Sequence, residues 1–350
     1  MKKKLHSISI RDKQERKNNN CESRGCSRFC NSPLGVFGER ECVSMSIDVI
    51  IPVYKPGKEL FTLLDRLENQ TVAINRIILM NTEEKYFEQL VYGKKFSEKY
   101  QNIKVYHLSK REFDHGGTRR RGVTKSDADI FVMMTQDALP ADEFLLENLT
   151  ANLRGKVAVS YGRQLPAKDC SLPERIGRSF NYPEYSRIKT EADLPELGIK
   201  TYFCSNVCAA YRRDVYEELG GFVRHTIFNE DMLYAAAAVK AGYGVAYEAQ
   251  AQVIHSHNYT NMQQLHRNFD LGVSQARHPE VFAGVPSESE GKRLMVETIR
   301  QLREKKLSRK IPAFCVQCAF KYAGYLLGKN YQRLPRRLVL SLTMNREYWK

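Results

Sequence analysis

The stretch Asp129-Ile-Phe-Val-Met-Met-Thr-Gln-Asp-Ala-Leu-Pro140 decides the fold of this chain. Its apolar run stops abruptly at the polar step Thr135-Gln-Asp137 and is followed by a turn-forming proline. Such a run, rich in Ile, Phe and Val, is typical of a buried strand in a parallel sheet. Ligands of open α/β sheets bind beyond the carboxyl ends of the strands. We therefore expect Asp137 to lie where the fold places its chemistry.

Further strands are predicted on both sides of this stretch. Apolar segments at Ile47–Val53, Arg76–Met80 and Ile103–His107 precede it. Between the first two, leucines recur at helical spacing in a segment that extends through Asn69, at Leu60, Leu63, Leu64 and Leu67. Strands separated by helices of about a dozen residues indicate right-handed βαβ units. The predicted fold class is therefore α/β, with a Rossmann-like, mostly parallel sheet flanked by helices and a helical C-terminal extension.

The composition limits the function classes. The chain has 350 residues, a formal charge of +15 and a pI near 9.3, so it calls for an acidic partner such as nucleic acid, an anionic membrane or a phosphorylated substrate. No run of eighteen apolar residues exists, and the amino terminus lacks the apolar core of a signal peptide. We expect a cytoplasmic protein.

Three regions follow from the distribution of charge and apolar residues. Residues 1–44 are basic and almost without hydrophobic periodicity, so we expect them to be disordered. They are either an extension that precedes a true start at Met45, or a basic arm for membrane or nucleic acid. Residues 45–280 form the main domain in this prediction, and residues 281–350 form a basic helical region.

The nine cysteines give no clear metal site or disulfide framework. Cys21, Cys26, Cys30 and Cys42 miss the paired spacing of common zinc sites. The pair Cys315 and Cys318 lies in an apolar helical pattern without a second pair. We therefore expect free thiols, since disulfides are rare in cytosolic proteins.

A loop and a basic helix start precede the central strand. The loop Phe113-Asp-His-Gly-Gly-Thr118 leads into a helix that carries Arg119, Arg120 and Arg121. Backbone N–H groups and guanidinium groups there could both face an anion. A solvated basic helix start is the alternative.

Four motifs together resemble one family. They are Val49-Ile-Ile-Pro-Val-Tyr54, the loop at 113–118, Thr135-Gln-Asp-Ala-Leu-Pro140, and Asn229-Glu-Asp231 further on. This set and order resembles the inverting family-2 glycosyltransferases of GT-A fold, and within them the bacterial rhamnosyltransferases that use dTDP-L-rhamnose. The resemblance covers roughly residues 46–280 and continues weakly to the carboxyl terminus.

The resemblance implies a divalent cation, Mg²⁺ or Mn²⁺, that neutralises the diphosphate leaving group. Family members commonly hold it with a D-x-D sequence, whereas Thr135 replaces the first carboxylate here and leaves Asp137 as the ligand. The resemblance adds a histidine after the strand Val245–Ile254, for which we favour His257 over His255. The alternatives are that Asp137 caps a helix beginning near Pro140 and that the histidines only close a strand.

The resemblance also implies a catalytic base in the acidic pair that opens the helix Met232–Ala241. We assign the base to Asp231 and an orienting role to Glu230, which is also the alternative base. An Asp with an ordinary pKa of about 3.9 is already a base at neutral pH. Capping of the helix start is the structural alternative.

Donor-binding residues are predicted at the strand ends and in two connecting segments. Gln164 is a further candidate in the long segment between Tyr161 and Tyr202, whose length is unusual for a loop without function. The predicted donor-binding residues are Pro52, Val53, Tyr54, Asn81, His115, Gly116, Gly117, Arg119, Gln136, Arg163 and Asn206.

The resemblance implies transfer of L-rhamnose, with inversion, onto a growing cell-surface polysaccharide or lipid-linked glycan. A family-2 enzyme that uses a UDP-sugar is the alternative, and a basic nucleic-acid-binding protein is the alternative outside enzymes. The helical pattern of residues 313–327, followed by basic residues, suits either an anionic membrane at the inner face of the plasma membrane or packing on the main domain.

Overall fold

The structure of the chain is a computed structural model, and it describes residues 45–285 and 288–350. The expectations for residues 1–44, including those for the four cysteines there, lie outside the described residues. Cys204 and Cys208 are buried free thiols, and Cys315 and Cys318 are also free, as expected.

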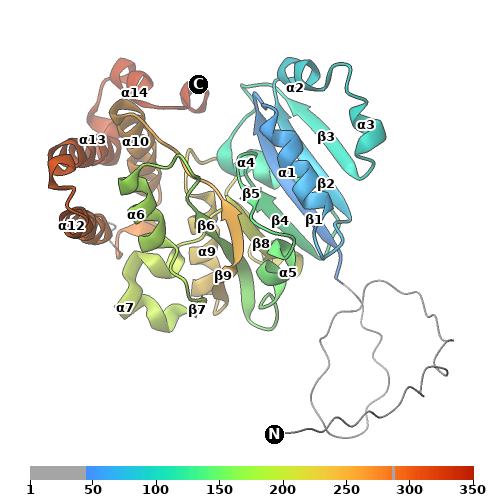
Figure 1. Cartoon of the computed structure of the whole chain (residues 1–350), viewed down its shortest axis with the longest axis horizontal. Coiled ribbons are helices and arrows are strands. Elements are labelled where there is room, and N and C mark those ends of the chain that lie inside the picture. Colours follow the sequence, from blue (N-terminus) through green and yellow to red (C-terminus); the bar gives the residue numbers. More distant parts are fainter. Residues whose placement is uncertain (1–44, 286–287) are drawn as a thin grey trace, which may run out of the picture. The chain divides into compact units, whose positions relative to one another are not determined.

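The strands of the described residues form one twisted sheet, in the order β3-β2-β1-β4-β8-β6-β9-β5, with β7 paired to β9 (Figure 1). They are β1 Ile47–Tyr54, β2 Arg76–Thr82, β3 Ile103–Leu108, β4 Ile130–Met134, β5 Leu139–Pro140, β6 Val157–Leu165, β7 Arg187–Lys189, β8 Cys208–Arg212 and β9 Gly244–Ile254.

The sheet is parallel in one half and mixed in the other. Strands β1 to β4 pair in parallel, which confirms the βαβ prediction for this half. Beyond them β8 runs antiparallel to both β4 and β6, while β6 and β9 are parallel to each other. The apolar strand patterns carry no information about direction, so the antiparallel β8 could not be predicted from them.

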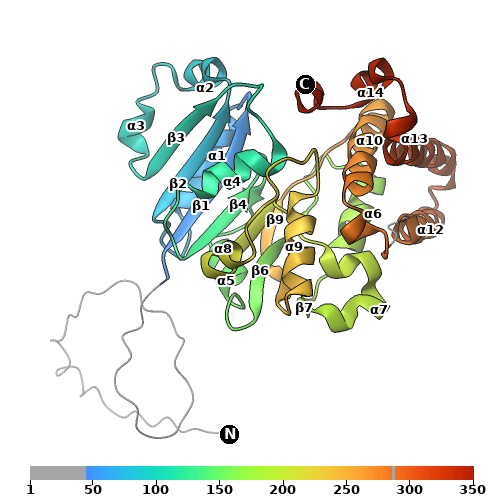
Figure 2. The ribbon, with the colours of Figure 1, turned by 180° about the vertical axis from the view of Figure 1, so that it is seen from behind.

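Helices cover both faces of the sheet because side chains alternate along each strand. In β1, Val49 and Ile51 pack with helix α1, Glu59–Glu68, on one face, whereas Ile50 packs with Val123 of helix α4 on the other. Figures 1 and 2 show α1 and α4 on opposite sides of these strands. The main helices are α1, α4 His115–Val123, α5 Leu145–Thr150, α6 Leu172–Asn181, α9 Glu230–Lys240, α10 Asn261–Arg277, α12 Glu288–Glu304, α13 Ile311–Lys329 and α14 Arg336–Leu342.

No helix begins near Pro140, just after β4, although a helix capped by Asp137 was one alternative there. Instead of a helix near Pro140, the short strand β5 pairs there with β9, and α5 begins only at Leu145. Asp137 is therefore not a helix cap. It lies in the turn that joins β4 to β5, at the carboxyl end of the parallel strands.

The long segment between Tyr161 and Tyr202 is structured. It contains α6, the strand β7 and the short helix α7, Leu194–Leu197. The side chain of Ile176 in α6 is buried, and β7 pairs with β9. These short elements could not be predicted, because they lack the long periodic runs on which sequence reading depends.

Helix α13 packs closely on α10. A side chain at Gly324 or Gly328 would collide with the backbone of Leu265 or Phe269, so these two glycines permit the close approach. The other face of α13 is exposed. No helix in the part of the chain that the structure describes is long and apolar enough to span a bilayer. The domain boundary at residue 280 stays a prediction.

Candidate active site

Three potential metal ligands meet at the carboxyl end of the sheet. The half-exposed carboxylate of Asp137 lies 3.6 Å from Nε2 of His255 and 3.4 Å from Nε2 of His257. The two histidines follow β9, and their rings are 4.6 Å apart between centroids. One carboxylate and two imidazoles converging on one point can hold a divalent cation. Both histidines face Asp137, although the sequence favoured only His257.

The neighbours of His255 fit a metal ligand. Its Nδ1 lies 2.9 Å from Oε1 of Gln164, which can only accept, so Nδ1 carries the proton. The lone pair of Nε2 then faces the carboxylate of Asp137, an arrangement that a cation between them stabilises. Arg178 donates to the same oxygen, and Nε2 of Gln164 donates to Oγ of Ser205 at 2.9 Å, so the carboxamide is held in place.

The electrostatics of the cluster also suit a cation. Burial and the neighbouring His255 lower the pKa of His257 to about 4, so its imidazole is neutral at pH 7. Burial raises the pKa of Asp137, but its contacts with His255 and His257 outweigh burial and leave the pKa below its ordinary value. A carboxylate and a neutral imidazole are the forms that bind metals.

The acidic pair lies at the start of helix α9. Glu230 is buried, and its Oε1 lies 3.1 Å from Nε of Arg119 and accepts from Nδ2 of Asn206 at 3.1 Å. Asp231 is only partly buried, and its Oδ2 accepts from the backbone N–H of Asn206 at 2.9 Å. Glu230 is therefore committed to internal partners, while Asp231 can meet a ligand.

Burial and the charge of Glu230 raise the pKa of Asp231 to about 7. The pKa of Glu230 falls, because the attraction of Arg119 outweighs the effect of burial. The two carboxyl groups thus differ, with the charged form of Glu230 favoured and Asp231 able to exchange a proton near neutral pH. The expectation that Asp231 has an ordinary pKa was wrong, since the sequence did not reveal its burial beside Glu230.

The backbone before this helix is held in an uncommon conformation. Asn229 has a φ of 64°, in the left-handed region, which asparagine tolerates better than most residues. Its Nδ2 donates to Oγ of Ser274 in α10 at 3.1 Å. This contact fixes the direction in which Glu230 and Asp231 leave the loop.

The end of β1 is fastened to the loop that carries Asp137. Oε1 of Gln136 accepts from the backbone N–H of Tyr54 at 2.9 Å, and its Nε2 donates to the carbonyl of Tyr54 at 3.0 Å. The ring of Tyr54 packs edge to face against Tyr86, with centroids 5.9 Å apart. Gln136 therefore supports the predicted donor residues Pro52, Val53 and Tyr54 through the backbone. Tyr86 had no signal in the sequence.

Asn81 lies beside Val53 in the sheet, as predicted, but its side chain is fully buried. Its Nδ2 lies 2.9 Å from Nδ1 of His107 in the neighbouring strand. In this conformation the amide is part of the core at the end of β2, and its side chain does not reach solvent.

The arginine helix is occupied by internal partners. Arg119 pairs with Glu230, Arg120 donates to the carbonyls of Gly220 and Phe222, and Arg121 lies 3.4 Å from Glu112. Each of the three guanidinium groups thus has an internal partner, and binding of an anion there stays a prediction. For Arg119 and Arg120 the partner lies about a hundred residues away in the sequence.

The start of the same helix is also filled. Oδ1 of Asp114 accepts from the backbone N–H of Gly117 at 2.8 Å. A side chain at Gly116 or Gly117 would collide with the backbone of residues 223 and 224, so these glycines serve close packing. The partly buried His115 lies next to the acidic pair, and burial lowers its pKa.

Of the two neighbours in β6, only Gln164 reaches the site. Arg163 pairs with Glu184 at 3.0 Å, because adjacent residues of a strand point to opposite faces. Asn206 is at the centre of the acidic pair, with its Oδ1 accepting from the hydroxyl of Tyr211 at 2.7 Å. Gln164 and Asn206 thus lie at the site, whereas Arg163 does not.

Known proteins resemble this chain over most of its length. The model of the family "Glycosyl transferase family 2" matches residues 48–220. The chain is 39% identical over 310 residues to the O-antigen chain rhamnosyltransferase RfbN of Salmonella typhimurium, covering 87% of this chain and 96% of that protein. It is 37% identical over 313 residues to the O-antigen chain rhamnosyltransferase WbaN of Salmonella anatum, with the same coverage of 87% and 96%.

A solved structure supports the fold. The mannosyltransferase PcManGT of Pyrobaculum calidifontis, in complex with GDP-Man and Mn²⁺, superimposes with a TM-score of 0.50 at 14% identity, covering 88% of this chain and 87% of that chain. The likeness confirms the predicted GT-A architecture. With these relatives and this fold, the chain belongs to glycosyl transferase family 2 and is a glycosyltransferase.

Proposed function

We propose that the protein transfers L-rhamnose from dTDP-L-rhamnose, with inversion, onto a growing cell-surface polysaccharide or lipid-linked glycan. The observation that carries this proposal is the similarity to two O-antigen chain rhamnosyltransferases over nearly their whole length. It is supported by the position of an acidic pair and an Asp-His-His cluster at the same edge of the sheet.

In this proposal Asp231 is the catalytic base. Its carboxylate takes the proton of the acceptor hydroxyl while the acceptor oxygen forms a bond to the anomeric carbon. The bond from that carbon to the diphosphate breaks on the opposite face, and its electron pair leaves with the diphosphate. Asn206 orients Asp231 through its backbone N–H, and Glu230 holds Asn206 in place.

Asp137, His255 and His257 would hold the divalent cation, either Mg²⁺ or Mn²⁺. When bound, the cation neutralises charge on the departing diphosphate. Gln164 keeps His255 in the required tautomer, and Gln136 fixes the loop of Asp137 against Tyr54. Two imidazoles among the ligands favour Mn²⁺ over Mg²⁺, because Mg²⁺ prefers oxygen ligands.

The acceptor would approach from the side of α10 and α13. A hollow of about 220 Å³ adjoins His257 and is lined mainly by polar side chains, among them Glu174, Gln264 and Gln317. Hydroxyl-rich sugars suit such a surface because carboxylates and carboxamides offer them several hydrogen bonds.

A lipid-linked acceptor would bring the protein to the inner face of the plasma membrane. The outer face of α13 exposes Val316, Tyr322 and Leu326, and exposed basic residues flank it at Arg309 and Arg333. We propose that this face touches an anionic bilayer, where each basic residue adds roughly 1 kcal/mol. Sedimentation with anionic liposomes tests it: binding should weaken in Leu326→Glu, and a wild-type protein that stays in solution would exclude the contact.

The donor is tested by incubating the protein with a panel of sugar nucleotides and Mn²⁺ or Mg²⁺ and following donor consumption. We expect dTDP-L-rhamnose to be consumed fastest. Preferential consumption of a UDP-sugar would replace rhamnose by the alternative donor, and no consumption of any donor would contradict the proposed function. Family membership leaves the nucleic-acid-binding alternative without support.

A further inference from the structure

Helix α10 presents a guanidinium group that the described residues leave without a carboxylate partner. Arg267 makes no ion pair and no hydrogen bond through its side chain among residues 45–285 and 288–350. It is nevertheless partly buried, so it has lost part of its hydration. An unpaired, partly buried cation is unfavourable unless a ligand completes it.

Aromatic rings hold this guanidinium in place. It lies 4.7 Å from the ring centroid of Phe228 and 5.8 Å from that of Tyr259. Such cation–π contacts orient a guanidinium while leaving its N–H donors free. The group is thus positioned without being satisfied.

The same two rings connect the guanidinium to both halves of the active site. Tyr259 stacks on the metal ligand His257, with centroids 4.8 Å apart. Phe228 lies 6.0 Å from the ring of His115, which is next to the acidic pair. Arg267 therefore lies between two groups of residues, the proposed metal ligands on one side and the acidic pair on the other. Its charge contributes to lowering the pKa values of His115 and His257, although burial is the main cause.

The nearest acidic residue on its own helix is engaged elsewhere. The carboxylate of Asp270 accepts from the hydroxyl of Thr343 at 2.7 Å and from the backbone N–H of Met344 at 2.9 Å. This interaction ties α10 to the C-terminal segment and does not neutralise Arg267.

We propose that Arg267 binds the phosphates of the nucleoside diphosphate and neutralises the charge that remains on them when the sugar has left. This inference rests on the proposed function, because it requires a nucleotide-sugar donor. A guanidinium binds phosphate oxygens through two parallel hydrogen bonds, which a lysine cannot reproduce. The proposal adds a third group, from α10, to the cation and the acidic pair.

Arg277 on the same helix provides a matched control. Its guanidinium also packs on rings, 5.0 Å from Tyr348 and 5.4 Å from Trp349, but it donates to the hydroxyl of Tyr348 at 2.6 Å. Arg277 is therefore satisfied within the protein, and its replacement by lysine retains the charge.

The test is calorimetric binding of dTDP and of dTMP, with Mn²⁺ present, to the full chain and its variants. We expect Arg267→Met to weaken dTDP binding roughly 100-fold and Arg267→Lys roughly 10-fold, with a smaller loss for dTMP. Arg277→Lys should bind both ligands as the wild type does. If the role of Arg267 were purely structural, its replacement would weaken the binding of dTDP and of dTMP equally.

The outcomes separate this inference from the proposed function. Equal affinity of wild type and Arg267→Met for dTDP, or equal losses for dTDP and dTMP, would overturn the role of Arg267 alone. Wild-type protein that binds neither dTDP, UDP nor GDP would overturn the proposed function and this inference with it. Circular dichroism melting of each variant checks that the protein is folded.

Discussion

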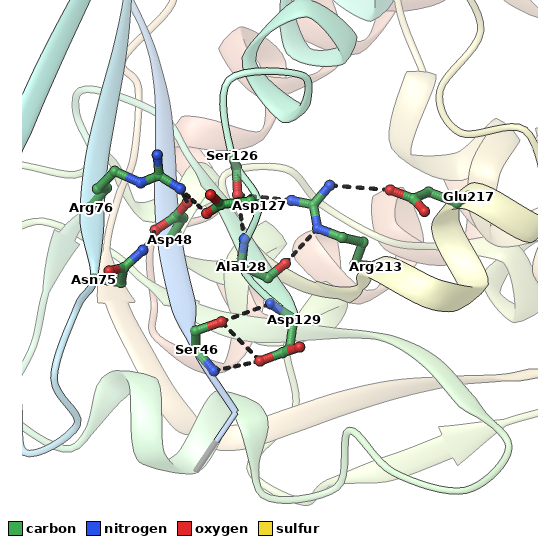
Figure 3. A network of polar contacts seen from close by, with 10 residues as sticks. All are labelled: Ser46, Asp48, Asn75, Arg76, Ser126, Asp127, Ala128, Asp129, Arg213 and Glu217. Carbon is green, nitrogen blue, oxygen red and sulfur yellow. Dashed lines mark hydrogen bonds and ion pairs between the residues drawn. The ribbon is translucent and has the colours of Figure 1, made fainter. Parts of the chain in front are cut away.

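Charged and polar side chains lie at both ends of the parallel strands, but they are paired differently at the two ends. At the amino end, the backbone N–H and the hydroxyl of Ser46 both donate to Asp129 at 2.8 Å, and Arg76 contacts Asp48 and Asp127 (Figure 3). Each charged group there faces a partner of opposite charge or a hydrogen-bonding neighbour.

At the carboxyl end, one carboxylate and two imidazoles converge on one point, and two carboxyl groups lie next to each other. Nε2 of His255 and Nε2 of His257 both face Asp137, and Asp231 lies beside a second carboxylate. A ligand can complete these arrangements, whereas the charged side chains at the amino end already face partners of opposite charge. Charged residues at the amino edge of the sheet therefore stabilise the fold, whereas those at the carboxyl edge are available to bind a ligand.

The largest effect is expected for Asp231→Asn, which removes the proposed base. Because general-base catalysis contributes roughly 100- to 10,000-fold, turnover should fall by about that factor while donor affinity stays nearly constant. Steady-state kinetics combined with dTDP binding measures both quantities. Asp129→Asn at the amino end is the control and should retain activity; turnover in Asp231→Asn close to wild type would refute the assignment.

Replacement of Gln164 by Leu should release the His255 imidazole from its required tautomer. Changes of this kind outside the ligands lower metal affinity by roughly 10- to 100-fold. Titration of activity with Mn²⁺ should show that shift, with the maximal rate largely recovered at saturating metal. Arg163→Gln, one residue away on the opposite face, should leave the titration unchanged, and an equal shift in both variants would contradict the role of Gln164.

The pH profile follows from the pKa of Asp231, raised to about 7 by burial and by Glu230. The base acts only when deprotonated, so kcat/KM should rise about tenfold per pH unit below pH 7 and level off above it. The profile should lose this limb in Asp231→Asn. An acid limb centred near pH 4 would mean that Asp231 titrates as an ordinary aspartate.

The smallest effect on catalysis is expected for Arg76→Met at the amino end. This change leaves the buried carboxylate of Asp48 without its cation, so it should reduce the free energy of unfolding by roughly 3 kcal/mol. The kcat of the folded fraction should remain within about twofold of wild type. Urea denaturation measures the free energy of unfolding, and kinetics at low temperature measure kcat. A large loss of kcat without loss of stability would contradict a purely structural role of the amino end.

Much of the fold could be predicted because strong local patterns specify it. The apolar runs of β1, β2 and β4 and the leucine spacing of α1 lie where the sequence placed them. Strand direction in the second half could not be predicted, since pairing of β8 with β4 and β6 depends on tertiary contacts.

The candidate site was predicted only in outline. The motifs predicted roles for Asp137, His257 and Asp231, whereas His255 was only the second choice beside His257. Segments distant in sequence supply the partners of Arg119 and Arg120 and the Phe228 ring beside Arg267, so these contacts could not be predicted. The raised pKa of Asp231 likewise arises from burial, which only the folded chain reveals.

The most direct test of the central claim is release of dTDP from dTDP-L-rhamnose by the full chain in the presence of acceptor glycan. We predict that release requires added Mn²⁺ or Mg²⁺, stops with a chelator, resumes when the metal is restored, and is strongly reduced in Asp137→Asn. Release that continues undiminished in the chelator and in Asp137→Asn would contradict the account.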